Sequence, residues 1–114
     1  RKIMIKVDST SKTIFEGIGK MIDAMVVDYS KGNNNERMFN EYKDGFKSIV
    51  GQKFIKITNG NGVKAFIVKE DNGKFKRGDI LKPASWRAPA KNSARGNVLE
   101  GGYAIQWTGP LYLR

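Results

Sequence analysis

Cysteine and histidine are both missing from this chain of 114 residues. Without cysteine the chain has no disulfide, no thiolate zinc site and no cysteine nucleophile. Without histidine it lacks the usual general base near neutral pH and the commonest transition-metal ligand, which rules out a Ser-His-Asp triad. Carboxylates, lysines, tyrosines and main-chain dipoles are what remains for catalysis. We therefore expect a binding protein and not an enzyme, with no catalytic residue, metal or cofactor.

Acidic residues are also scarce. The sequence has 11 Asp and Glu against 21 Lys and Arg, which gives a net charge of +10. This excess repels itself, and a polyanion, an acidic protein face or an anionic membrane would relieve it. No apolar run approaches the ~20 residues that span a bilayer, and the first residues are too charged for a signal peptide. We therefore expect a cytoplasmic protein that does not enter a membrane.

The first part of the chain is predicted to form a strand and a long helix. Apolar residues alternate with others over residues 2–7, which is typical of a half-buried strand. Thr13 and Glu16 have the spacing of a capping box. The apolar residues that follow recur at helical spacing, which predicts a helix over residues 11–29.

Two glycines, Gly17 and Gly19, lie within this helix and weaken it by up to about 1 kcal/mol each relative to alanine. Their small size would let a neighbouring element approach the helix closely. A second amphipathic helix is predicted from the spacing of the apolar residues at 38–49. This helix is expected to end near Val50, where Gly51 supplies a C-cap.

After the second helix the apolar spacing changes to the period of two that is typical of strands. Strands are predicted at residues 54–58 and 63–69, joined by the hairpin signal Asn-Gly-Asn-Gly at residues 59–62. Shorter strands are expected at residues 80–82, 97–99, 103–107 and 111–113.

These elements predict a single α+β domain. Residues 1–51 would form the strand and the two helices, and residues 52–114 a twisted antiparallel sheet or a small barrel with a basic loop at residues 83–96. The core is expected to consist of the residues in the apolar phase of each segment, namely Ile3, Ile5, Ile14, Ile18, Ile22, Met25, Phe39, Phe46, Ile55, Ile57, Ile67, Ile105 and Trp107.

The basic loop and the residues beside it are the most informative segment. Between residues 74 and 95 the sequence has seven Lys and Arg and a single acid, Asp79, and seven minus one gives +6. Pro83 and Pro89 restrict the loop and lower the entropy cost of presenting it to a partner. Arg and Lys contact phosphates, and a Trp can stack on a base or act as a wedge. The candidate nucleic-acid-binding residues are Lys76, Arg77, Lys82, Trp86, Arg87, Lys91 and Arg95.

Trp86 has an alternative assignment to the core, where it would hold a long loop in place. Both assignments stay open at this point. The carboxylates Glu36, Glu41 and Asp44 of the second helix have no facing carboxylate in the sequence pattern, and they are interpreted as a solvated helix face.

Four segments near the C-terminal end resemble successive strands of an SH3-like or KOW-type barrel. Their pattern is a basic-Gly-Asp-apolar strand, an Arg-Gly-x-Val strand and an aromatic-rich strand. The resemblance implies a small barrel, interrupted here by a long insertion at residues 83–93. The segments are residues 77–81, 94–99, 103–107 and 109–113.

A second resemblance concerns the string KPASWRAPAK at residues 82–91, followed by ARGN at residues 94–97. It is similar to a box in small tailed-bacteriophage proteins that have no assigned activity. The resemblance implies a phage origin and hence a place in the cytoplasm of the host cell. Phage proteins of this size often bind DNA or take over the host by inhibiting one of its proteins.

Charge, loop composition and resemblance together favour the binding of DNA or RNA through phosphates, with little reading of sequence. The alternative is an inhibitor or adaptor that docks the same basic surface on an acidic host protein. Charge does not separate the two hypotheses, because both partners are polyanionic. The sequence also leaves open DNA against RNA, single against double strand, and the oligomeric state.

Overall fold

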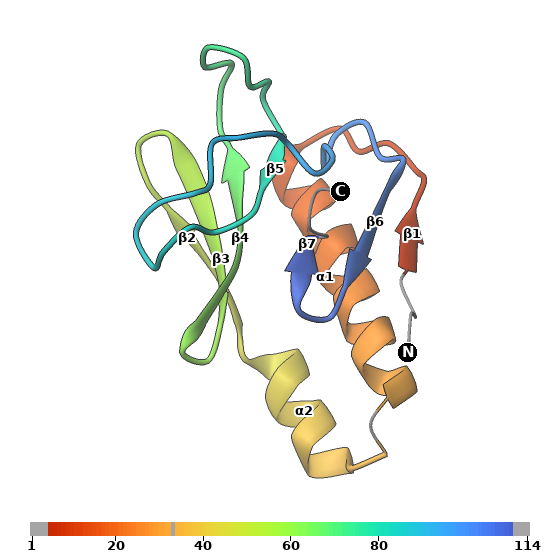
Figure 1. Ribbon diagram of the computed structural model, residues 1–114. Helices are drawn as coiled ribbons and strands as arrows, with labels where there is room; N and C mark the ends of the chain where they lie inside the picture. The colour runs from red at the N-terminus through yellow and green to blue at the C-terminus, as the bar shows by residue number, and fades with distance from the viewer. Residues whose placement is uncertain (1–4, 33, 111–114) are drawn as a thin grey trace.

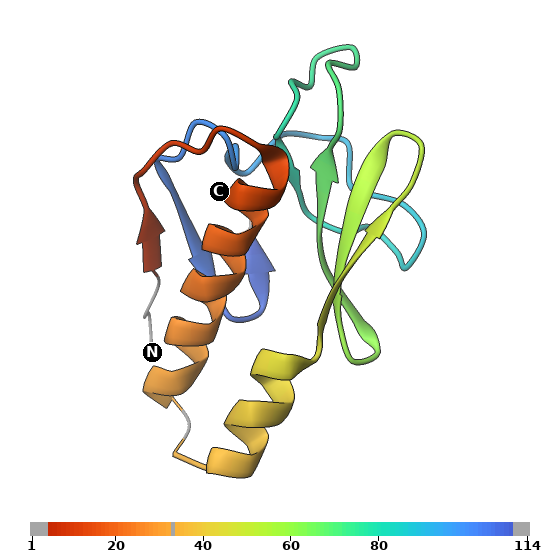
Figure 2. The same ribbon diagram turned by 180° about the vertical axis from the view of Figure 1, so that it is seen from behind.

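Two helices and seven strands form an α+β fold in the computed structural model, which describes residues 5–32 and 34–110 (Figure 1, Figure 2). This confirms the predicted fold class. The elements are β1 (Ile5–Val7), α1 (Ile14–Gly32), α2 (Glu36–Asp44), β2 (Phe46–Val50), β3 (Phe54–Asn59), β4 (Gly62–Val68), β5 (Ile80–Leu81), β6 (Tyr103–Gln106) and β7 (Gly109–Pro110). The predicted strand at residues 111–113, the start of the first predicted strand and Ile3 of the predicted core lie outside the described residues.

The strands fall into two antiparallel sheets, with the order β1-β6-β7 in one and β2-β3-β4-β5 in the other. α1 runs beside both sheets, and α2 leads from the end of α1 to the edge strand β2 (Figure 1, Figure 2). Met21 and Met25 of α1 belong to one buried cluster with Ile57 of the four-stranded sheet and Ile105 of the three-stranded sheet. The core is therefore shared by α1 and both sheets.

Most of the predicted core is confirmed. The buried side chains of the prediction are Ile14, Ile18, Met25, Ile55, Ile57, Ile67 and Ile105. Those packed against the cluster but only partly buried are Ile5, Ile22 and Phe46. Phe39 and Trp107 are half-buried.

The start of α1 is capped by Thr13 and Glu16, the two residues of the predicted capping box, with Lys12 in place of Thr13 as the donor to Glu16. The backbone N–H of Glu16 donates to the Thr13 hydroxyl at 3.0 Å, and the Glu16 carboxylate accepts from the backbone N–H of Lys12 at 2.7 Å. Two N–H groups that have no partner within the helix are satisfied in this way. The cap fixes the start of α1 at Ile14.

An aromatic cluster joins the two helices to the turn between β6 and β7. The buried Asp28 carboxylate accepts from the backbone N–H of Trp107 at 2.8 Å, and the Tyr42 hydroxyl donates to the Trp107 carbonyl at 2.6 Å. The Tyr29 and Tyr42 rings stack with centroids 4.2 Å apart. Burial, with the nearby Asp28 charge, raises the pKa of Tyr42 well above its usual range, so this hydroxyl stays protonated and keeps donating.

Replacing Tyr42 with Phe tests the strength of this link. The ring and its stacking stay, and only the 2.6 Å hydrogen bond to Trp107 is lost. We expect the free energy of unfolding to fall by about 1 kcal/mol, measured by urea denaturation. An unchanged unfolding midpoint would show that the bond adds nothing to stability.

The predicted end of the second helix is wrong. α2 ends at Asp44, Gly45 caps it, and Phe46–Val50 forms the edge strand β2. Five consecutive residues of β2 pair with β3, from Phe46 opposite Asn59 to Val50 opposite Ile55. The apolar residues of this segment fit helical spacing as well, but pairing with β3 overrides that preference. The β-rich part therefore begins at residue 46 and not at residue 52.

The predicted strand at residues 97–99 is also wrong, because the chain turns at this point. Asn97 makes a single bridge to Asp79, and residues 98–100 form a turn. The Asn97 side-chain oxygen accepts from the backbone N–H groups of Leu99 at 2.8 Å and Glu100 at 3.1 Å, which bends the chain away from a strand. The four segments that resemble a barrel thus supply β5 to one sheet and β6 and β7 to the other.

Candidate functional site

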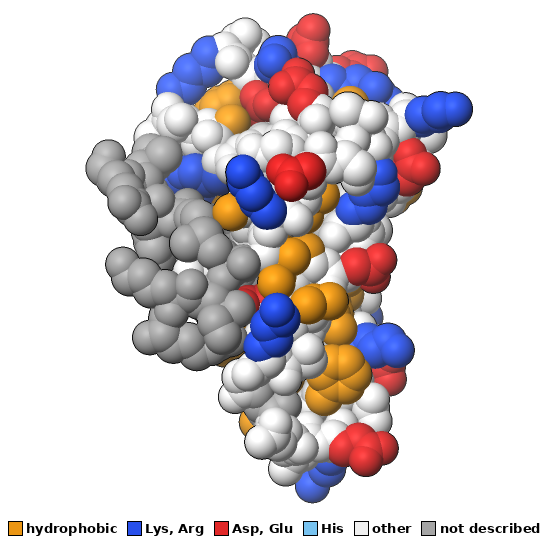
Figure 3. All heavy atoms as spheres, turned by 90° about the vertical axis from the view of Figure 1, so that its right-hand side faces the viewer, with side chains coloured by type: hydrophobic (Ala, Val, Ile, Leu, Met, Phe, Trp, Pro, Cys, Tyr) orange, Lys and Arg blue, Asp and Glu red, His pale blue; other side chains and the backbone are white. Residues whose placement is uncertain are grey.

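Acidic residues are absent from the segments that build the four-stranded sheet. Residues 45–69 contain five lysines and no acid, and residues 80–99 contain four basic residues and no acid. These segments supply all strands of that sheet and the loop at residues 83–96. On the side of the molecule that carries α1 and β1, by contrast, Asp and Glu are interspersed with Lys and Arg (Figure 3). The strands of this sheet and its loop therefore carry no acidic side chain, and Glu70, Asp71 and Asp79 lie in the connection between β4 and β5.

The loop lies across one face of this sheet, which we name the outer face (Figure 1). Alternation along β3 places Ile57 in the core cluster shared with α1, and Phe54 and Lys56 on the outer face. The Lys56 Nζ lies 4.7 Å from the centroid of the Trp86 ring, and the Lys91 Nζ lies 5.9 Å from the centroid of the Phe54 ring. These contacts place the basic loop over the outer face.

The loop begins as a short hydrogen-bonded hairpin over residues 82–90. Its two prolines form a bridge, and a backbone bond of 2.7 Å closes its base. At the tip the Ser85 N–H donates to the Ala88 carbonyl at 3.1 Å, and the Ser85 hydroxyl accepts from the N–H groups of Arg87 at 3.3 Å and Ala88 at 3.2 Å. Trp86 and Arg87 thus occupy the middle of a tight turn. The loop presents them on an ordered support.

Trp86 is exposed, with 48% of its surface open to solvent. The alternative that it is a core residue is therefore wrong. Its ring contacts the Lys56 ammonium through a cation–π interaction that itself contributes about 0.5–1 kcal/mol at an exposed site. An indole held in this way at the tip of a turn is available for stacking.

The structure leaves three of the predicted phosphate contacts open to solvent, namely Arg77, Arg87 and Lys91. Lys76 is also exposed, but its Nζ pairs with the Glu100 carboxylate at 2.9 Å. The hydrogen bond and the charge of Glu100 raise the pKa of Lys76. This ion pair partly neutralises Lys76, which makes it a weaker candidate for a phosphate contact than Arg87 or Lys91.

Lys82 and Arg95 are turned inward, unlike the other predicted contacts. The Lys82 Nζ donates to the Pro110 carbonyl at 2.9 Å, and burial followed by the charge of Arg95 lowers the pKa of Lys82. Arg95 reaches the Asn92 side-chain oxygen at 3.3 Å, while its Nε and Nη1 atoms are buried without a partner among the described residues. These two side chains are placed to brace the loop, and we remove them from the open contact surface.

Three basic residues that the sequence analysis did not select belong to this region. Lys56 faces Trp86, and the Lys74 Nζ donates to the Asn92 carbonyl at 2.5 Å, which ties the preceding turn to the loop. Lys47 is exposed and shares the outer face with Lys56 by its register on β2. The sequence pattern could have identified Lys56, because this residue lies in the polar phase of β3 between two buried isoleucines.

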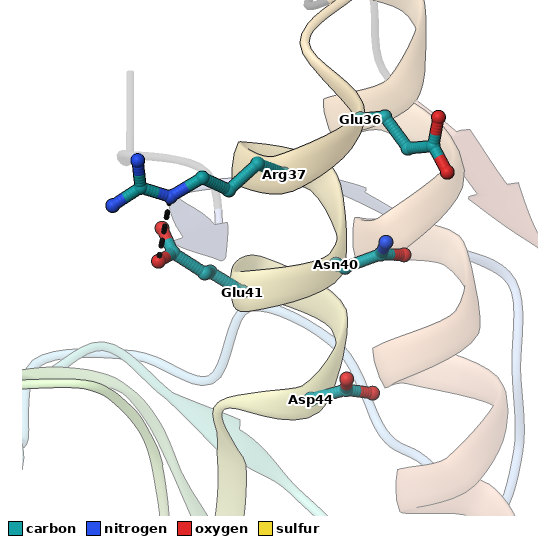
Figure 4. Close-up of a pocket in the computed structure, with 5 residues that line it drawn as sticks. All are labelled: Glu36, Arg37, Asn40, Glu41 and Asp44. Carbon is teal, nitrogen blue, oxygen red and sulfur yellow. Dashed lines mark ion pairs between the residues drawn. The ribbon is translucent and has the colours of Figure 1, made fainter.

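A hollow of about 670 Å³ lies along α2. Glu36, Asn40 and Asp44 point to one side of the helix, whereas Arg37 and Glu41 point to the other and pair at 3.6 Å (Figure 4). The carboxylates therefore do not converge on one point, which fits the interpretation of a solvated helix face. Within residues 5–32 and 34–110, no three acidic side chains are grouped so as to hold a metal ion.

The fold and this surface define a class, an α+β domain with a basic loop braced over one face of an acid-free sheet. The chain belongs to a family described as a family of unknown function (DUF7717), whose model matches residues 2–112. No curated protein and no solved structure matches it. Neither helix in the described part of the chain is long and apolar enough to cross a membrane.

Proposed function

We propose that this protein binds nucleic acid through phosphate contacts, with little reading of sequence. The observation that carries the proposal is the half-exposed Trp86 at the tip of an ordered basic hairpin, over a sheet whose segments contain no acid. Arg87, Lys91 and Lys56 supply the nearest cations, and Lys47 extends the basic surface along β2. Phosphate contacts position a protein on nucleic acid without reading its sequence.

The order of the loop supports binding on energetic grounds. A flexible loop would lose about 0.5–1.5 kcal/mol for each long side chain that it immobilises on its partner, in addition to the backbone entropy. Here the hairpin at residues 82–90 is already closed by backbone hydrogen bonds and two prolines. Most of the backbone ordering is therefore complete before the partner arrives, which leaves more of the electrostatic attraction available for binding.

A protein partner remains the second candidate, and one observation favours it. Ile49 lies on the outer face and Val50 follows it on the free edge of the sheet, with 46% and 56% of their surfaces exposed. Apolar side chains beside cations suit the face of an acidic protein better than they suit a phosphate backbone. With the phage resemblance, such a partner would be an acidic protein of the host that this chain inhibits or recruits.

Salt dependence and a pair of matched variants test the first proposal. The protein should retard random-sequence DNA or RNA in a gel at about 50 mM salt. If about four to six phosphates are neutralised, log K should fall against log salt with a slope of roughly −3.5 to −5.5 on duplex DNA. Arg87→Ala with Lys91→Ala should weaken binding and leave thermal stability nearly unchanged, because exposed charges add little to folding.

The matched control removes two charges from the helices, by Lys31→Ala with Lys43→Ala. Both residues are exposed and lie in the last turns of α1 and α2. The control should lose much less affinity than the loop variant although the net charge is the same. Equal losses would mean that only net charge matters, and no retardation at low salt would reject nucleic acid in favour of a protein partner. A pull-down with and without nuclease would then identify that partner.

A further inference from the structure

A shallow hollow of about 370 Å³ lies between the hairpin tip of the loop and the turn that joins β3 to β4. Its size falls at the lower end of small-molecule sites, which span about 300–1,000 Å³. Two separate turns of the chain build it, so its shape depends on the loop being held over the sheet. The lining residues are Asn61, Val63, Pro83, Ala84, Ser85 and Trp86.

The hollow combines an aromatic wall with a few polar groups. Val63 and Pro83 are half-buried and provide apolar surface, and Trp86 provides a planar ring. The amide of Asn61 offers both a donor and an acceptor, and the Ser85 hydroxyl, which accepts two backbone N–H groups, keeps its own proton to donate. Such a combination suits a flat heteroaromatic group with donors and acceptors along its edge.

We propose that this hollow is a subsite for one unpaired nucleobase stacked on Trp86, so that the protein prefers single-stranded nucleic acid to a duplex. This inference rests on the proposed function. Within a duplex each base is stacked between its neighbours and offers only its groove edges, so its face cannot reach an aromatic side chain. A single strand can turn one base out onto Trp86 while its phosphates stay on the basic surface.

The position of Lys56 supports stacking coupled to phosphate binding. Its ammonium lies over one face of the Trp86 ring, 4.7 Å from the centroid, so a base that stacks on the other face lies close to a cation. A nucleotide carries its base and its phosphate within one unit, and Trp86 with Lys56 offers one partner to each. Asn61 can meet either a donor or an acceptor, Ser85 can meet an acceptor, and the subsite therefore accepts any base.

Substitutions at Trp86 test the subsite by fluorescence anisotropy on two probes, a labelled 20-nucleotide oligo(dT) and a labelled duplex of the same length. Trp86→Ala and Trp86→Leu should weaken oligo(dT) binding by about 5- to 150-fold, because stacking on the indole is lost. Trp86→Phe should retain most of the affinity, because it keeps an aromatic face. Duplex affinity should change by less than about threefold in all three variants.

Trp86→Leu and Trp86→Phe form the decisive pair, because both keep an apolar side chain at the tip and melting curves verify the fold of each. Equal oligo(dT) affinity in the two would overturn the subsite, and so would an equal loss on duplex and single strand. In either case wild-type binding to both probes would leave the proposed function standing. If the wild-type protein binds neither probe, the subsite and the proposed function both fail.

Discussion

Asn97→Ala is expected to lower the free energy of unfolding by about 3–5 kcal/mol, since each buried polar group left without a partner costs about 1–3 kcal/mol. The Asn97 side chain is buried and makes four hydrogen bonds. Its nitrogen donates to the Arg77 carbonyl at 3.0 Å and to the Asp79 carboxylate at 2.9 Å. Its oxygen accepts from the two N–H groups of the following turn. Alanine removes all four bonds, and the buried Asp79 carboxylate keeps the bond that it accepts from the Lys76 N–H at 2.8 Å.

Urea denaturation of Asn97→Ala and Asn92→Ala gives the comparison. Asn92 is an exposed asparagine of the same loop whose side-chain oxygen accepts from the Ser93 N–H at 2.8 Å and from Arg95 at 3.3 Å. Its replacement should cost less than about 1 kcal/mol, because water can take the place of the lost partner. If the two variants unfold at the same midpoint, the four hydrogen bonds of Asn97 do not stabilise the fold as its burial indicates. We call Asn97 with its hydrogen-bond partners the Asn97 hub.

The Asn97 hub should also affect the proposed binding, because it joins the two ends of the basic loop. Asp79 immediately precedes β5, Asn97 immediately follows residue 96, and the bond between their side chains closes the base of the segment that carries Trp86. Asn97→Ala should therefore weaken binding as well as stability. The loop variants at Arg87 and Lys91, by contrast, should weaken binding without lowering stability, since both side chains are exposed.

Local signals in the sequence were enough to predict much of the fold. The Thr13 and Glu16 cap, the Asn-Gly turn at residues 59–62 and the alternation along β3 each act over a few residues, and the structure contains all three. The strand β2 was missed because its apolar residues continue the helical spacing of α2. Gly45, the C-cap of α2, was the local evidence against a continuous helix, because glycine is a poor helix former.

Which candidate side chains face solvent was predicted less well, because side-chain direction depends on partners distant in the chain. Lys82 binds a carbonyl 28 residues further on, and Asp28 accepts from an N–H that follows it by 79 residues. Neither contact has a sequence signature, so Lys82 could not be told from Arg87 by composition. Trp86 is exposed because the turn at Ser85 reverses the chain before the indole can reach the core.

The second large effect on stability is expected at the glycines of α1. The same substitution, glycine to alanine, should lower the free energy of unfolding at one of them and raise it at the other. A Cβ added at Gly17 would lie 2.4 Å from the backbone oxygen of Val98 and 2.8 Å from its Cβ. Because the obstacle includes backbone, it cannot rotate away, and Gly17→Ala should cost about 1–3 kcal/mol of stability. A Cβ at Gly19 meets no atom within 4 Å. Gly19→Ala should instead add about 0.5–1 kcal/mol, since alanine is the better helix former.

Thermal and urea unfolding of the two variants measure whether each substitution raises or lowers stability. Each variant serves as the control for the other, because both change glycine to alanine in the same helix. The close approach of α1 to the turn at Val98 predicts that only Gly17 is required for packing, while Gly19 weakens the helix without making room for a neighbour. A stabilised Gly17→Ala would mean that the turn after Asn97 can move away from α1. The base of the basic loop would then be less rigid than its hydrogen bonds indicate, and the preorganisation that supports the proposed binding surface would be lost with it.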